Sequence, residues 1–187
     1  MDLEQVPGRA FLDTSCLNFI LENGERIFDG VSPPEELSKR AIKDIDAFFN
    51  IFLTGKRATW QLAISPFTYK ELIFTQDNKK RYYLENWFMD VWNYWLGIIK
   101  ENNDLPSFIE AENIRVKLLS SGILDVLPDM EDRVLITDAI VYRCDCFCTR
   151  DWQTILKYRK HLTSLPIEII TPTEWWNLIR RFASLWV

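Results

Sequence analysis

The stretch Arg9-Ala10-Phe11-Leu12-Asp13-Thr14-Ser15 places a short apolar run directly before an acid and two hydroxyl residues. The run is typical of a buried strand, and Thr14 and Ser15 favour the start of a helix that stops near Gly24. Asp13 therefore falls at the carboxyl end of a predicted strand. Open α/β sheets bind their ligands just outside that end of their strands.

The same alternation of strand and helix continues along the chain. Further strands are predicted at 60–64, 123–127, 144–149 and 167–170, and helices at 35–53, from 65, at 79–104, 106–120 and 128–142, from 151 and from 171. This order predicts an α/β fold in which a mostly parallel sheet of about five strands is covered by helices. The absence of a linker or an internal repeat predicts a single domain over residues 1–187.

Four acidic residues each follow the end of a separate predicted strand. They are Asp13, Glu71, Asp132 and Asp151. Because the carboxyl ends of parallel strands meet at one edge of a sheet, we expect the four carboxylates to converge. Carboxylates without a nearby His or Cys form a hard-oxygen site that suits Mg²⁺ or Mn²⁺, and such sites typically activate water against a phosphodiester.

Each acid taken alone has a simpler structural interpretation. Asp13 and Asp151 are suited to capping helices, Asp132 lies near the positive end of a helix dipole, and Glu71 fits a solvated helix position. The functional interpretation depends on all four lying at the same end of one sheet.

Asp138 competes with Asp132 for the third place. It lies six residues later in the same predicted helix, roughly 9 Å further along the axis and about 120° around it. Both side chains are therefore not expected to bind one ion directly. We favour Asp132 as the ligand and leave Asp138 a supporting role behind the ligands or at the edge of the core.

Composition and charge limit the classes of site and function that the sequence supports. The single histidine argues against a His-rich metal centre, and three of the four cysteines alternate in one predicted strand, which favours buried residues over disulfides or zinc. The net charge of −5 weighs against nucleic-acid binding, although basic residues cluster locally, as at 79–81 and 157–161. An acidic start and the lack of a long apolar run predict a cytoplasmic protein without membrane contact.

The predicted helix at 79–104 carries many aromatic residues on one apolar face. The face comprises Leu84, Trp87, Phe88, Val91, Trp92, Trp95 and Ile99. Three interpretations remain open: packing on the protein's own core, a homodimer or partner surface, and base stacking. We favour packing on the core, with a homodimer as the alternative.

The acids and their surroundings resemble the PIN-domain nucleases. That family's pattern opens with a strand ending in Asp before Thr or Ser, here Phe11-Leu12-Asp13-Thr14-Ser15. A Glu follows in the helix after the second strand, here Glu71 after Ser65-Pro66. A third acid then opens a helix, here at Asp132, and a strand leads to Thr-x-Asp, here Thr149-Arg150-Asp151.

The resemblance implies a three-layer PIN-like fold and a metal-dependent ribonuclease, often the toxin of a toxin–antitoxin pair. By comparison with the smallest members, helices at about 35–53 and 79–120 are insertions. The resemblance also implies an RNA substrate and a small antitoxin protein as partner.

Our first hypothesis is a Mg²⁺- or Mn²⁺-dependent endoribonuclease in which Asp13, Glu71, Asp132 and Asp151 hold one or two ions and Thr149 or Thr14 orients a carboxylate or the water. The alternatives are a non-catalytic scaffold of the same fold that binds RNA or protein through the aromatic helix, and a phosphohydrolase of small molecules. Carboxylates packed together without metal repel one another, which favours the enzyme.

Overall fold

Four short parallel strands form the sheet at the centre of the computed structural model, which describes residues 6–58, 60–73, 76–101 and 105–185, without the side chains at 56–57, 71–73, 80 and 185. The strands are β1 (Arg9–Leu12), β2 (Gln61–Ala63), β3 (Cys146–Cys148) and β4 (Glu168–Ile170). Their order is β2-β1-β3-β4, and each neighbouring pair is parallel. The predicted α/β class is therefore confirmed.

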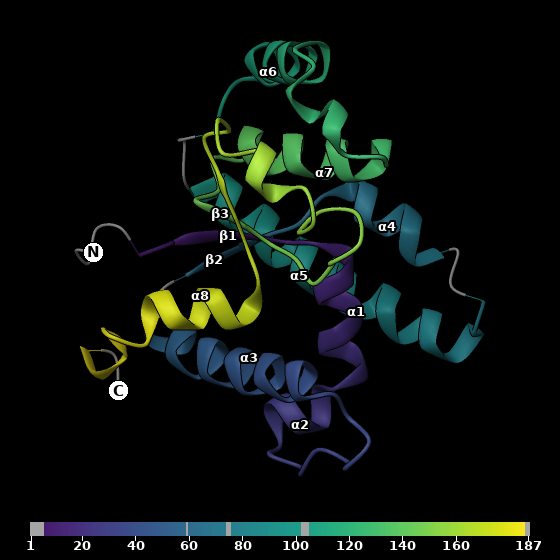
Figure 1. The fold of residues 1–187 in the computed structure, drawn as a ribbon, viewed down its shortest axis with the longest axis vertical. Coiled ribbons are helices and arrows are strands. Elements are labelled where there is room, and N and C mark those ends of the chain that lie inside the picture. The colour runs from purple at the N-terminus through teal and green to yellow at the C-terminus, as the bar shows by residue number, and fades with distance from the viewer. Residues whose placement is uncertain (1–5, 59, 74–75, 102–104, 186–187) are drawn as a thin grey trace.

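Helices surround this sheet (Figure 1). They are α1 (Thr14–Glu22), α2 (Gly24–Phe28), α3 (Lys39–Ala58), α4 (Pro66–Ile73), α5 (Asn78–Glu101), α6 (Phe108–Ser120), α7 (Met130–Val141) and α8 (Pro172–Ile179). Short 3₁₀ helices occupy Ile123–Val126 (η2), Arg159–His161 (η3) and Ala183–Leu185 (η4). Helices α4 and α8 both begin with proline, which is suited to the first helical position because it needs no backbone N–H there.

The two central strands, β1 and β3, are buried on both faces and send alternate side chains into two separate cores. Ala10 and Leu12 of β1 pack in one core with α1, α3 and α8, whereas Phe11 packs in the other with α7 and the buried Trp95 of α5. Strand β3 divides in the same way, with Phe147 on the side of Phe11. Largely apolar strands are what a sheet covered on both faces requires.

The predicted strand at 123–127 is wrong, so the sheet has four strands instead of about five. The segment forms η2 after Gly122, whose φ of 77° lies in the left-handed region that glycine adopts readily. Leu124 and Leu127 are buried, while Ile123 and Asp125 are exposed. This spacing of three residues fits one side of a 3₁₀ helix, in which i and i+3 lie together.

The predicted helix from Asp151 is also absent, because residues 152–158 form turns before η3. The backbone N–H of Leu156 donates to the carbonyl of Asp151, five residues earlier, and that of Tyr158 donates to Ile155, three residues earlier. These bonds close turns of different size and do not build the i to i−4 ladder of an α-helix.

The aromatic face of α5 is largely inside the protein. Leu84, Phe88 and Trp95 are buried, and Trp87 and Trp92 are half-buried against the two cores. Packing of this face on the chain's own core was the favoured prediction, and the buried rings agree with it. A homodimer remains a prediction.

In the part of the chain that the structure describes, none of the helices is both long enough and apolar enough to cross a bilayer.

Candidate functional site

The strand order places a topological switch point at β1. The chain runs from β1 outward to β2 on one side, and it returns to the other side of β1 for β3. Connections that leave in opposite directions open a crevice at the carboxyl ends of such neighbouring strands, where ligands of α/β proteins bind. Asp13 follows β1, and Thr149 and Asp151 follow β3. The sequence-predicted acids of these two strands therefore flank the switch point.

Asp13 is buried and is held by two hydroxyl groups. Thr149 Oγ1 donates to Asp13 Oδ2 over 2.7 Å, and Ser15 Oγ donates to the same oxygen. Burial raises the pKa of Asp13 above its ordinary value, the hydroxyl donors oppose this, and the charge of Asp151 adds to it. The hydroxyl of Thr14, the other residue predicted to orient a carboxylate, is buried without a hydrogen-bond partner among the described residues.

Asp151 organises the loop that follows β3. Its Oδ1 accepts the backbone N–H groups of Gln153 and Thr154 at 2.7 and 2.8 Å, and its Oδ2 accepts the Thr154 hydroxyl. Its own backbone N–H donates to Thr149 Oγ1 over 3.0 Å. Asp151 and Asp13 are thus connected through Thr149, which accepts from one residue and donates to the other.

Asp132 faces the same cluster from the first turn of α7. Its pKa is raised to about 6, first by burial and also by the charges of Asp13, Asp129 and Asp151, while the hydroxyl of Thr154 lowers it. Its Oδ2 is buried and has no hydrogen-bond partner among the described groups. A buried carboxylate oxygen without a donor is costly, which makes this atom a candidate ligand for a cation.

The side chains of Asp13, Asp132 and Asp151 are not arranged as a metal site. Among the residues with described side chains, no group of three or more His, Cys, Asp or Glu is arranged to hold an ion. The charge of Asp151 nevertheless raises the pKa of Asp13, and the charges of Asp13 and Asp151 both raise the pKa of Asp132. The three residues therefore form an acidic cluster that interacts electrostatically, and oxygens of Asp13 and Asp151 accept from hydroxyl donors. Glu71 lies in α4, and its side chain is outside the described ones.

Asp138, the alternative third acid, has a different environment. It is buried, its Oδ1 accepts from Arg115 Nε over 2.9 Å, and its Oδ2 accepts from the Ser65 hydroxyl. The carboxylate is therefore fully paired, and it joins α7 to α6 and to the start of α4. Each of its oxygens has a donor, and the Arg115 guanidinium already offsets its charge.

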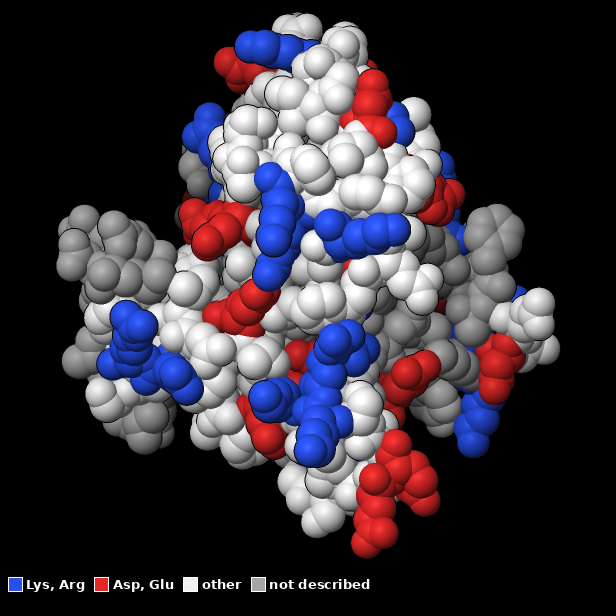
Figure 2. Space-filling view, in the orientation of Figure 1, with Lys and Arg blue, Asp and Glu red and all other residues white. Residues whose placement is uncertain are grey.

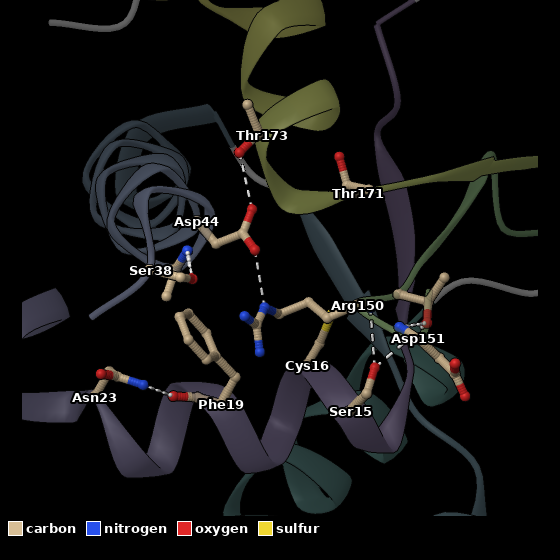
Figure 3. A network of polar contacts seen from close by, with 12 residues as sticks. Ser15, Cys16, Phe19, Asn23, Ser38, Asp44, Arg150, Asp151, Thr171 and Thr173 are labelled. Carbon is tan, nitrogen blue, oxygen red and sulfur yellow. Dashed lines mark hydrogen bonds and ion pairs between the residues drawn. The ribbon is translucent and has the colours of Figure 1, made fainter. Parts of the chain in front are cut away.

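An ion pair behind the cluster fixes the loop after β3. Arg150 Nε donates to Asp44 Oδ2 of α3 over 2.9 Å, and the guanidinium carbon lies 3.4 Å from the centre of the Phe19 ring (Figure 3). The backbone N–H of Arg150 donates to Ser15 Oγ over 2.9 Å. Residues 149–151 are thereby connected to both α1 and α3.

Sequence reasoning missed these supporting residues. Ser15 is named there only for the helix start and the family motif, Thr154 is not singled out, and Asp44 lies in a helix predicted to be an insertion. The position of Ser15 two residues after Asp13 was a usable signal, because short hydroxyl side chains often bond to groups two residues away. Nothing local in the sequence pairs Asp44 with Arg150, 106 positions later.

The raised pKa of Asp132 predicts that metal-free protein loses stability as pH rises. A carboxyl whose pKa goes from 3.8 unfolded to about 6 folded binds more protons in the folded state between those values. The free energy of unfolding should fall across this range by on the order of 1–2 kcal/mol, after allowance for solvent screening. Urea denaturation with a chelator present measures it.

Asp132→Asn is the matched comparison. The variant should be as stable as the parent at about pH 4 and more stable at about pH 7. A stability difference that does not change with pH would show that Asp132 is not the group responsible.

Comparisons of the chain with protein-family models, with curated proteins and with solved structures gave no match. Membership of the PIN-domain family therefore remains a prediction from the motifs around Asp13, Glu71, Asp132 and Asp151.

Proposed function

We propose that this protein is a Mg²⁺- or Mn²⁺-dependent endoribonuclease with a three-layer PIN-like fold. Asp13, Asp132 and Asp151 would hold the ion, with Glu71 of α4 as the fourth carboxylate. The observation that carries the proposal is the buried, unpartnered Oδ2 of Asp132 beside two further acids at the switch point of the sheet.

The donor set fits a hard divalent cation. The candidate ligands are carboxylate oxygens, which Mg²⁺ and Mn²⁺ prefer, and no thiol or imidazole is among them. An ion bound in such a site lowers the pKa of water and offsets the negative charge that develops on a phosphodiester during hydrolysis. A cation would also relieve the desolvation and repulsion that raise the pKa values of Asp13 and Asp132.

The chain's own groups supply orientation. Ser15 and Thr149 hold Asp13 Oδ2 in place, and Thr154 together with two backbone N–H groups holds Asp151. The single proton of the Thr154 hydroxyl goes to Asp151, so this hydroxyl cannot donate to Asp132 at the same time. Pre-oriented ligands of this kind reduce the cost of organising a site when substrate binds.

Cation binding gives the most direct test. Mn²⁺ at about ten times its Kd should stabilise the fold by about 1.4 kcal/mol, which is a rise in melting temperature of roughly 3–6 °C. The rise should be accompanied by proton release near pH 6, because Asp132 must ionise to bind. Scanning calorimetry measures the rise in melting temperature. Titration calorimetry in two buffers of different ionisation enthalpy measures the proton release.

Cleavage of single-stranded RNA should require the same cation and stop when a chelator is added. Asp132→Asn should lose the thermal shift and the cleavage together. The exposed Asp46→Asn variant on α3 is a matched control that should keep both. A parent protein whose melting temperature is unchanged by millimolar Mn²⁺, and which does not cleave RNA, would contradict the proposed function. An antitoxin partner remains a prediction.

A further inference from the structure

A basic groove lies beside the acidic cluster, between the beginning of α3 and the loop that follows Asp151. Its volume is about 260 Å³. Lys39, Arg40 and Lys43 of α3 line one side of this basic groove, and Trp152 of the loop lines the other. Figure 2 shows basic side chains gathered over the beginning of α3.

Arg40 and Trp152 form a stacked pair across the groove. The guanidinium carbon of Arg40 lies 4.0 Å from the centre of the Trp152 ring. Such a cation–π contact holds both flat groups in a defined orientation. Trp152 is still 41% exposed, so part of its ring remains open to a ligand. An exposed aromatic ring at the edge of a cavity offers a flat apolar surface on which a ligand ring can stack.

The charge of the groove is positive although the chain is acidic overall. Asp44 also lines the groove, but its carboxylate accepts from Arg150 over 2.9 Å and from the Thr173 hydroxyl over 2.8 Å (Figure 3). Among the described residues, no acid lies within ion-pair distance of Lys39, Arg40 or Lys43. Three cations therefore stand together on a protein of net charge −5.

The groove is connected to the acidic cluster through consecutive residues. Trp152 follows Asp151 directly, so their Cα atoms are about 3.8 Å apart. Arg150, on the other side of Asp151, pairs with Asp44 in the wall of the groove. The groove and the acidic cluster therefore adjoin each other along residues 150–152.

We propose that the basic groove holds the part of a single-stranded RNA that adjoins the cleaved bond. Lys39, Arg40 and Lys43 would bind backbone phosphates, and an unpaired base would stack on Trp152. This inference rests on the proposed ribonuclease function. Single-stranded RNA fits because a base can stack on a protein ring only when it is free of a duplex, and lysines hold phosphates without reading sequence.

Binding of a non-cleavable oligonucleotide tests the groove separately from catalysis. We would use a fluorescein-labelled 2′-O-methyl oligouridylate of roughly ten nucleotides and measure anisotropy with a chelator present. Trp152→Ala should weaken binding by about 5-fold or more at every salt concentration. The double variant Lys39→Ala with Lys43→Ala should lower the slope of log K against log salt by about 1.4, because two phosphate contacts are lost.

Two matched variants control for folding and for general charge. Trp152→Phe keeps an aromatic ring and should retain most of the affinity. Lys117→Ala removes an exposed lysine from α6, on a different part of the surface, and should bind like the parent. Circular dichroism melts establish that each variant is folded before its affinity is compared.

The outcomes separate this inference from the proposed function. Groove variants that bind and cleave RNA like the parent would overturn the groove while leaving the ribonuclease intact. Loss of oligonucleotide binding in Trp152→Ala, in a parent protein that never cleaves, would support the groove and contradict the ribonuclease. Equal weakening by Lys117→Ala, or equal affinity for duplex RNA, would overturn a single-strand site at Trp152.

Discussion

Replacing Asp13 with Asn should lower RNA cleavage by on the order of 1000-fold while the protein stays folded. The amide has the shape of the carboxylate, and its oxygen can still accept from Ser15 and Thr149. The variant lacks only the negative charge that a divalent cation would require. Because burial already disfavours that charge, the metal-free variant should be no less stable than the parent.

Cleavage of a labelled single-stranded RNA in Mn²⁺, measured under single-turnover conditions, gives the rate. Asp46→Asn, an exposed acid-to-amide change on α3, is prepared in parallel to exclude a contaminating nuclease. Ser15→Ala keeps the charge and removes one donor, so its loss should be smaller, about 10- to 100-fold. An Asp13→Asn protein that cleaves as fast as the parent would remove this carboxylate from the mechanism.

The fold was predictable where the sequence pattern and the environment agree. The run Ala10-Phe11-Leu12 before Asp13 is apolar, and it forms most of a central strand that is buried on both faces. The segment 123–127 is also largely apolar, yet it forms η2. Leu124 and Leu127 are buried on one side of it, in the core to which α6 and α7 also contribute. A short apolar run does not by itself distinguish a strand from a 3₁₀ helix, because tertiary contacts determine which of the two forms.

The positions of the acids in the site were predictable to a similar extent. Asp13 and Asp151 could be placed from the strand ends alone, since parallel strands bring these ends to one edge. The partners of Asp151 lie within three residues of it, whereas the contact of Thr149 with Asp13 spans 136 positions of sequence and is not fixed by any local pattern. The same is true of the basic groove, where Arg40 and Trp152 meet only after α3 packs beside the loop that follows β3. Long-range pairing of this kind has no local sequence signature.

Replacing Arg115 with Met should have the second large effect, because Arg115 pairs with Asp138. The free energy of unfolding should fall by about 3–5 kcal/mol. Asp138 is buried, and Arg115 is the cation that offsets its charge. Methionine fills much of the space but leaves the carboxylate with only the Ser65 hydroxyl as a partner. The melting temperature should fall by roughly 6–20 °C.

A double-mutant cycle identifies the cause of that loss. Asp138→Asn removes the buried charge, so adding it to Arg115→Met should restore most of the lost stability, because no uncompensated charge remains. Cleavage measured below the melting temperature should persist in Arg115→Met, whereas Asp132→Asn should stay folded and lose cleavage. This opposite behaviour follows from the two environments: one acid of α7 is fully paired in the core, and the other has a buried oxygen without a partner. If Arg115→Met instead abolished cleavage without changing stability, Asp138 would belong to the chemistry and Asp132 would lose its assigned place.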